Sequence, residues 1–165
     1  MKSIQMDLLK FAFDFANQSK KILTNNYFKK FSVEEKNDGS LVTNIDKEIE
    51  EKFRTKLKKK FPNHGVIGEE FGNENESNEF VWIIDPLDGT HSFIAGKPLF
   101  GTLISCTKNY EPIIGLIDIP ILNQRWFGGK KLGVKLNNQA CVKPRNKKKF
   151  NDLIMASTSL LMFDK

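Results

Sequence analysis

Cysteine is scarce in this chain, which has only Cys106 and Cys141 among its 165 residues. The two do not form a CxxC pair, so reduced, partly buried thiols are a simpler interpretation than a zinc site or a disulfide framework. A long uninterrupted apolar run is also lacking near the start, where Asp7, Lys10 and Asp14 interrupt the apolar residues. This pattern does not fit a signal peptide or a membrane-spanning helix, so we expect a cytoplasmic protein without a membrane partner.

Acidic residues are fewer than basic residues: the chain has 20 Asp and Glu residues and 26 Lys and Arg residues, which gives a net charge of +6. Lysines gather at 56–60 and at 147–149. Such clusters can attract phosphate esters or nucleic acid, but they are usually solvated surfaces. No RNA-binding aromatic signature, zinc finger or helix-turn-helix pattern accompanies them, so no nucleic-acid partner is expected.

The N-terminal part of the chain predicts two amphipathic helices. From residue 3 to about residue 30, apolar residues recur on one helical face. In the second helix, Thr43 and Asp46 fit a capping box, and an apolar stripe continues to the turn at 61–65. The stripe consists of Ile45, Ile49, Phe53 and Leu57.

Beyond this turn the sequence predicts strands. A short apolar piece at 66–68 and a core strand at 80–84 flank a polar tract, 73–79, which we interpret as a surface loop. Further strand candidates are 100–107, 113–119, 125–127, 132–135 and 140–142. Closely spaced strands form an antiparallel meander, so we predict an α+β fold with two helices packed on a mostly antiparallel sheet. Residues 1–150 are expected to form one domain, and 151–165 to start a second domain or to add an edge strand.

Acidic residues follow two of the predicted strands. Glu69 and Glu70 come after the piece at 66–68, and Asp85 and Asp88 come after the core strand. Carboxylate oxygens are the ligands that Mg²⁺ prefers. Acids that converge without Lys or Arg partners repel one another, and a bound cation is the simplest compensation.

The residues after the second pair of acids favour a phosphate site. Gly89 permits a close backbone approach, and a short helix beginning at Thr90 would offer its first N–H groups to an anion. Each residue also has a simpler interpretation: Asp46 would serve only the capping box, His91 would cap the short helix, and the other acids would be turn charges. Their joint occurrence favours a site.

Three segments in order, DGSLVTNID, GEEFG and WIIDPLDGT, resemble the N-terminal motifs of the inositol monophosphatase family, which are Mg²⁺-dependent, lithium-sensitive phosphomonoesterases. Within this family, HSFIAGKPLFGTLIS and GLIDIPILNQRWFGG are similar to the histidinol-phosphate phosphatases. The resemblance implies the first half of the αβαβα sugar-phosphatase fold, a Mg²⁺ cofactor and hydrolysis of histidinol phosphate. Inositol 1-phosphate or another small phosphate ester is the alternative substrate, and a non-catalytic metal- or phosphate-binding fragment is the alternative function.

The resemblance assigns a role to each motif position. A first Mg²⁺ would be held by Glu69, Asp85 and the Leu87 carbonyl, and a second by Asp85 and Asp88. The implied catalytic residues, which orient or deprotonate the attacking water, are Asp46, Thr90 and Glu70. The implied phosphate- or substrate-binding residues are Gly89, Thr90, Lys36 and His91.

One family motif is missing from the chain. The family has a further metal-binding Asp in a Trp-Asp-x-Ala motif in its second half, and neither Trp82 nor Trp126 is followed by Asp. The second Mg²⁺ would then lack a ligand, so the 165-residue chain by itself is expected to be weakly active or inactive. The family also commonly forms homodimers, which the resemblance implies here.

Overall fold

The computed structural model describes residues 2–37 and 39–141. The predicted segment at 151–165, the end of the last strand candidate at 142 and the lysine cluster at 147–149 lie outside these residues.

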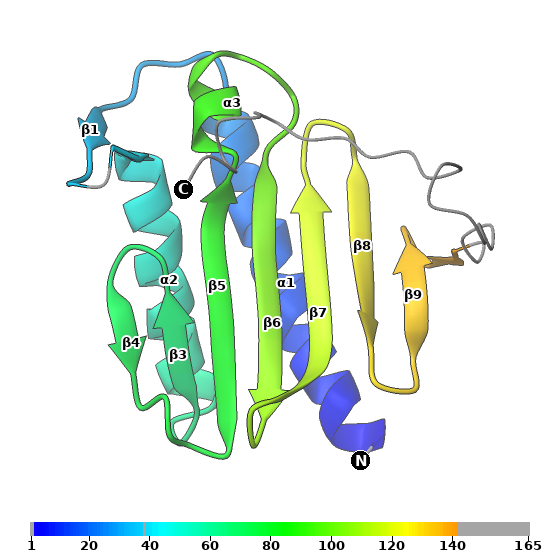
Figure 1. Ribbon diagram of the computed structural model, residues 1–165. Helices are drawn as coiled ribbons and strands as arrows, with labels where there is room; N and C mark the ends of the chain where they lie inside the picture. Colours follow the sequence, from blue (N-terminus) through cyan, green and yellow to red (C-terminus); the bar gives the residue numbers. More distant parts are fainter. Residues whose placement is uncertain (1, 38, 142–165) are drawn as a thin grey trace, which may run out of the picture.

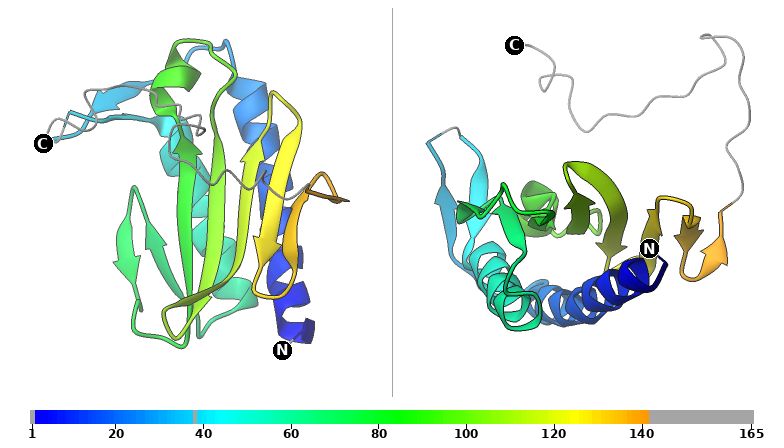
Figure 2. Two further views of the ribbon diagram at one scale, coloured as in Figure 1. Left: turned by 45° about the vertical axis from the view of Figure 1, so that its right-hand side comes forward. Right: turned by 90° about the horizontal axis from the view of Figure 1, so that it is seen from below.

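Two long helices cover the same face of one sheet (Figures 1 and 2). They are α1 (Lys2–Asn26) and α2 (Asn44–Lys60), and no helix of the described residues is long and apolar enough to cross a membrane. α1 ends before residue 30 because Phe28 has a φ of +64°, which is incompatible with a right-handed helix. α2 begins as predicted, with Thr43 as N-cap and both hydrogen bonds of the capping box to Asp46 present.

The sheet has eight strands in the order β10-β9-β8-β7-β6-β5-β3-β4. The strands are β3 (Gly65–Gly68), β4 (Gly72–Glu74), β5 (Phe80–Asp88), β6 (Gly101–Lys108), β7 (Glu111–Ile119), β8 (Gln124–Gly129), β9 (Gly133–Leu136) and β10 (Gln139–Ala140). Among these eight strands, β3 and β5 pair in parallel and all other neighbours are antiparallel. The prediction of helices packed on a mostly antiparallel sheet is therefore confirmed.

The core lies between the helices and the sheet. Phe11 of α1, Phe53 of α2 and Trp82 of β5 meet edge to face, with ring centroids 4.9 to 5.9 Å apart. Successive side chains of a strand point to opposite faces, so Ile83 and Asp85 lie on the face away from the helices. On that face a groove of about 440 Å³ runs past these two residues and is otherwise lined mainly by apolar side chains of β6 to β9.

Three features of the strands differ from the sequence prediction. The polar tract at 73–79 is not wholly a loop, because β4 includes its first two residues and pairs with the edge of β3. A hairpin of β1 (Val33–Glu35) and β2 (Leu41–Thr43) was not predicted, since β1 is exposed along its whole length and has no apolar alternation. β5 continues beyond residue 84 through Pro86, where a register shift against β6 accommodates the missing N–H group.

Candidate active site

β5 runs on past the end of β3 toward α3 (Thr90–Ile94) and the start of α2 (Figure 1). β3 and β5 are parallel, with Gly68 opposite Ile84. The next residues, Glu69 and Asp85, are therefore neighbours, and the charge of Glu69 acts on the Asp85 carboxyl group. The tertiary structure thus brings together two acids that are far apart along the chain.

Asp85 has the environment least favourable to a negative charge. Burial, the charge of Glu69, a hydrogen bond with Glu69 and the charge of Asp88 together raise the pKa of Asp85 from 3.8 to about 8. Its Oδ1 atom is buried and has no hydrogen-bond partner among the described residues. A buried carboxylate oxygen without a partner, beside two further acids, would be satisfied by a divalent cation.

Asp46 reaches the same region from the first turn of α2. Its Oδ2 accepts hydrogen bonds from the Thr43 backbone N–H, at 2.9 Å, and from the Thr43 hydroxyl. Its Oδ1 accepts a hydrogen bond from the Thr90 hydroxyl at 3.3 Å. Burial raises the pKa of Asp46, although the hydrogen bonds from Thr43 and Thr90 oppose this shift. Helix capping and a role in the site are compatible, because they use different oxygens of one carboxylate.

Lys36, in the loop between β1 and β2, contacts the acids that follow β3. Its Nζ atom is 2.8 Å from Glu70 Oε1 and 3.3 Å from Glu69 Oε1. Burial lowers the pKa of Lys36, but the hydrogen bonds and charges of the two acids outweigh it and raise the pKa overall. Burial raises the pKa of Glu70, and the contact with Lys36 opposes that shift. The assumption that the acids converge without a cationic partner is therefore wrong for Glu69 and Glu70.

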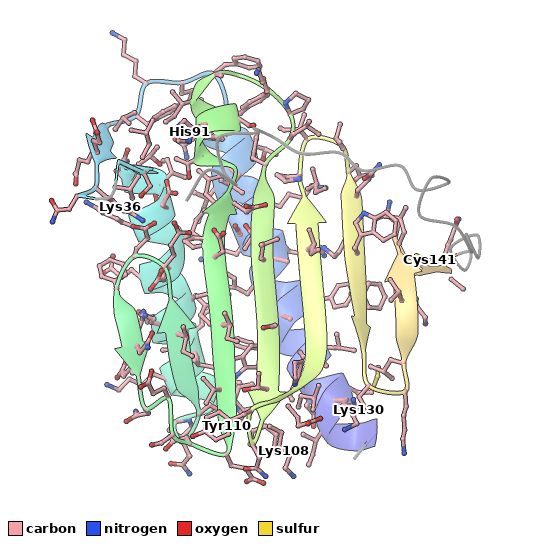
Figure 3. All side chains as sticks on the ribbon, in the orientation of Figure 1. Lys36, His91, Lys108, Tyr110, Lys130 and Cys141 are labelled. Carbon is pink, nitrogen blue, oxygen red and sulfur yellow. The ribbon has the colours of Figure 1, made fainter. Side chains whose placement is uncertain are left out.

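The turn into α3 depends on Gly89, which has a φ of +84° and whose Cβ, if present, would lie 2.9 Å from the Leu99 carbonyl oxygen. No side chain caps α3. The Thr90 hydroxyl has a single hydrogen, and it is within reach of both the Leu87 carbonyl oxygen, at 3.0 Å, and Asp46 Oδ1, at 3.3 Å. The Leu87 carbonyl keeps a second lone pair in either case. His91 lies at the same end of the molecule as Lys36 (Figure 3), but its side chain is exposed and has no hydrogen bond or ion pair with another described residue.

The described residues offer the oxygen donors that a divalent cation prefers, but they do not form a complete set of ligands. No group of three or more His, Cys, Asp or Glu side chains within residues 2–37 and 39–141 has the spacing of a metal site. Glu69 contacts Lys36, and Asp88 is exposed. The fit therefore rests on the unpartnered Oδ1 of Asp85 and on the carboxylate chemistry around it.

A model of the inositol monophosphatase family matches residues 5–161, a range that includes all the site residues above. The chain belongs to the inositol monophosphatase family. It is 39% identical over 150 residues to the chloroplastic bifunctional phosphatase IMPL2 of Arabidopsis thaliana, with 90% of this chain and 43% of the relative covered. It is 37% identical over 131 residues to a histidinol-phosphatase of Chlorobaculum parvum, with 78% of this chain and 50% of the relative covered.

The comparison with solved structures agrees with this membership of the inositol monophosphatase family. An IMPase of Thermotoga maritima matches with a TM-score of 0.79 at 28% identity, covering 85% of this chain and 55% of that one. The prediction of the first half of the family's fold is confirmed. The chain spans about half the length of the curated relatives it matches.

Two residues near the acids were not singled out from the sequence. Glu50 of α2 is fully buried, and Arg54, one helical turn later, donates two hydrogen bonds to it at 2.8 and 2.9 Å. The signal was present, because residue 50 falls on the apolar face next to Ile49 and Phe53. A carboxylate in that position needs a cation four residues away or a set of N–H donors.

Proposed function

We propose that the protein containing this chain is a Mg²⁺-dependent phosphomonoesterase that hydrolyses histidinol phosphate to histidinol and phosphate. The observation that carries the proposal is the hydrogen bond between Thr90 and Asp46 at the end of the sheet where Asp85 has an unpartnered oxygen. A linked hydroxyl and carboxylate suit proton removal from water, and neighbouring acids suit a metal.

Asp46 and Thr90 would handle the proton of the attacking water. When the Thr90 hydroxyl turns its one hydrogen from the Leu87 carbonyl to Asp46, its oxygen retains lone pairs that accept a hydrogen bond from water. As the water oxygen bonds to phosphorus and the bond to the alcohol oxygen breaks, the water proton would pass through Thr90 to Asp46, and the leaving oxygen would take a proton from solvent to give the alcohol. The raised pKa of Asp46 makes it a better proton acceptor than an exposed Asp.

The acids around Asp85 would hold Mg²⁺. Asp85, Glu69 and Asp88 supply carboxylate oxygens, and the Leu87 carbonyl has a lone pair available. Mg²⁺ held by these residues would supply positive charge that makes the attacking water more acidic and offsets charge on the leaving oxygen. Backbone N–H groups at Gly89 and Thr90 would orient the phosphate, and Lys36 would limit the repulsion between the acids and the substrate.

The choice of substrate rests on likeness. The segments at 91–105 and 115–129 resemble histidinol-phosphate phosphatases, and the Chlorobaculum parvum relative carries that name. Inositol 1-phosphate is the second candidate, because the solved Thermotoga maritima neighbour is named an IMPase. The described residues include no contact that discriminates between the two alcohols.

A direct test compares phosphate release from histidinol phosphate and from inositol 1-phosphate, with and without Mg²⁺, for the full-length protein that contains this chain. Asp46→Asn keeps an oxygen for the capping box but removes the proton acceptor, so a rate loss of about 100-fold or more is expected. Glu51→Gln, at an exposed position of the same helix, serves as the control. Faster hydrolysis of inositol 1-phosphate than of histidinol phosphate would overturn the substrate assignment. An Asp46→Asn protein that releases phosphate at the wild-type rate would overturn the mechanism.

The 165-residue chain provides a second comparison. We expect it to release little or no phosphate, since it lacks the Trp-Asp-x-Ala motif of its family. Turnover by the isolated chain at the rate of the full-length protein would contradict this expectation. Mg²⁺ binding without turnover in the full-length protein would instead support a non-catalytic binding function.

A further inference from the structure

The buried carboxylate of Glu50 makes contacts that reach beyond its own helix. Oε2 accepts a hydrogen bond from the backbone N–H of Glu70 at 2.8 Å, and Oε1 accepts one from the N–H of Phe71 at 3.1 Å. Oε1 also accepts both hydrogen bonds from Arg54. The side chain is fully buried, so water does not satisfy it, and these four donors account for both oxygens.

The backbone of the turn lies directly against this carboxylate. A Cβ atom added to Gly68 would lie 2.0 Å from Glu50 Oε1 and 2.7 Å from Arg54 Nη2. Arg54 also donates to the Gly72 carbonyl and lies 3.6 Å from the carboxylate of Glu74. The Glu50–Arg54 pair therefore contacts the chain on both sides of the segment that carries Glu69 and Glu70.

Helix α2 also carries Asp46, one turn before Glu50. A helix is rigid over one turn, so a turn fixed to Glu50 is also fixed relative to Asp46. Glu69 repels Asp85, and its contact with Lys36 offsets only part of that repulsion. Repulsion from Asp85 favours movement of the turn between β3 and the three-residue strand β4 toward solvent. The two hydrogen bonds from Glu70 and Phe71 to Glu50 oppose that movement.

We propose that Glu50, held by Arg54, is a positioning residue that sets the distance from the acids of the β3–β4 turn to Asp46 and Asp85. The predicted consequence of this positioning, a higher affinity for Mg²⁺, rests on the proposed function. A buried ion pair adds little stability relative to apolar side chains of the same size. Glu50 accepts hydrogen bonds from two adjacent backbone N–H groups next to the acids, which indicates that it positions the turn that carries them.

The test uses Glu50→Gln in the full-length protein, with Glu51→Gln as the exposed control on the same helix. Glutamine keeps one oxygen acceptor, but its NH₂ group faces either Arg54 or a backbone N–H. Amide hydrogen exchange of residues 68–74 is expected to accelerate about tenfold or more relative to β5. The Mg²⁺ concentration that gives half of the thermal stabilisation is expected to rise about 10- to 100-fold, the range for residues that support metal ligands.

A second variant keeps the proposal falsifiable if Glu50→Gln folds poorly. Arg54→Lys retains a positive charge but loses the two-pronged contact, so an intermediate change in both measurements is expected. Exchange and Mg²⁺ response within twofold of wild type in a folded Glu50→Gln protein would overturn the proposal, and so would a uniform loss of stability without a local change. Absence of any Mg²⁺ response in wild type would contradict the proposed function, and the exchange comparison would still decide the positioning role.

Discussion

Replacing Asp85 by Asn is expected to stabilise the metal-free chain at alkaline pH and to remove its response to Mg²⁺. The pKa of Asp85 is raised from 3.8 to about 8 in the folded chain. Between these values the folded chain binds a proton that the unfolded chain releases, so the contribution of Asp85 to stability is full below about pH 4 and is lost as the pH rises through about 8. Asparagine resembles the protonated acid and is not subject to this loss.

The size of the effect follows from the same pKa difference. At about 1.4 kcal/mol per pKa unit, the difference between 3.8 and about 8 sets an upper limit of about 6 kcal/mol. Asp85 is only partly buried, and solvent screens its repulsion from Glu69 and Asp88, so a stabilisation of about 1 to 3 kcal/mol near pH 9 is expected. The effect should be much smaller near pH 5, where wild-type Asp85 is protonated in the folded chain.

The assay is urea unfolding followed by tryptophan fluorescence at pH 5, 7 and 9, since Trp82 is fully buried. Each measurement is made with a chelator and with Mg²⁺. Binding at ten times the dissociation constant stabilises wild type by about 1.4 kcal/mol, and no such gain is expected for Asp85→Asn. Asp14→Asn, at an exposed position of α1, is the control. A less stable Asp85→Asn chain at pH 9 without metal would refute the argument that these acids repel one another.

Two further outcomes are expected. Gly89→Ala should cost more stability than Gly133→Ala in urea unfolding, because both residues have positive φ, which costs about 1 to 2 kcal/mol, but only at Gly89 does the new Cβ meet an atom, the Leu99 carbonyl oxygen. Equal losses would show that the turn into α3 relaxes. Burial lowers the pKa of His64, whose Nδ1 accepts a hydrogen bond from Trp82, so stability should fall as the pH drops below about 6.5, and His64→Gln should flatten this dependence. An unchanged pH profile in that variant would exclude His64 as the source.

The sequence predicted the parts of the fold that depend on neighbouring residues. The apolar period of α1 and α2, the Thr43 cap and the alternation in the central strands are local patterns, and the structure confirms them. The sequence did not predict β4. The residues of β4 are polar, and they become a strand only because the edge of β3 supplies hydrogen-bond partners. The β1–β2 hairpin was missed for a similar reason, since none of the residues of β1 is buried.

The candidate site divides in the same way. The sequence by itself determined that Glu69 and Glu70 follow a strand, that Gly89 follows Asp88 and that Asp46 belongs to a capping box, because these features depend on residues a few positions apart. Only the tertiary structure decided that Glu69 lies beside Asp85, through the parallel pairing of β3 with β5. It also decided that Lys36 neutralises part of the cluster and that buried Glu50 holds the acidic turn. Contacts of this kind depend on strand pairing and burial across distant segments, which spacing along the chain does not specify.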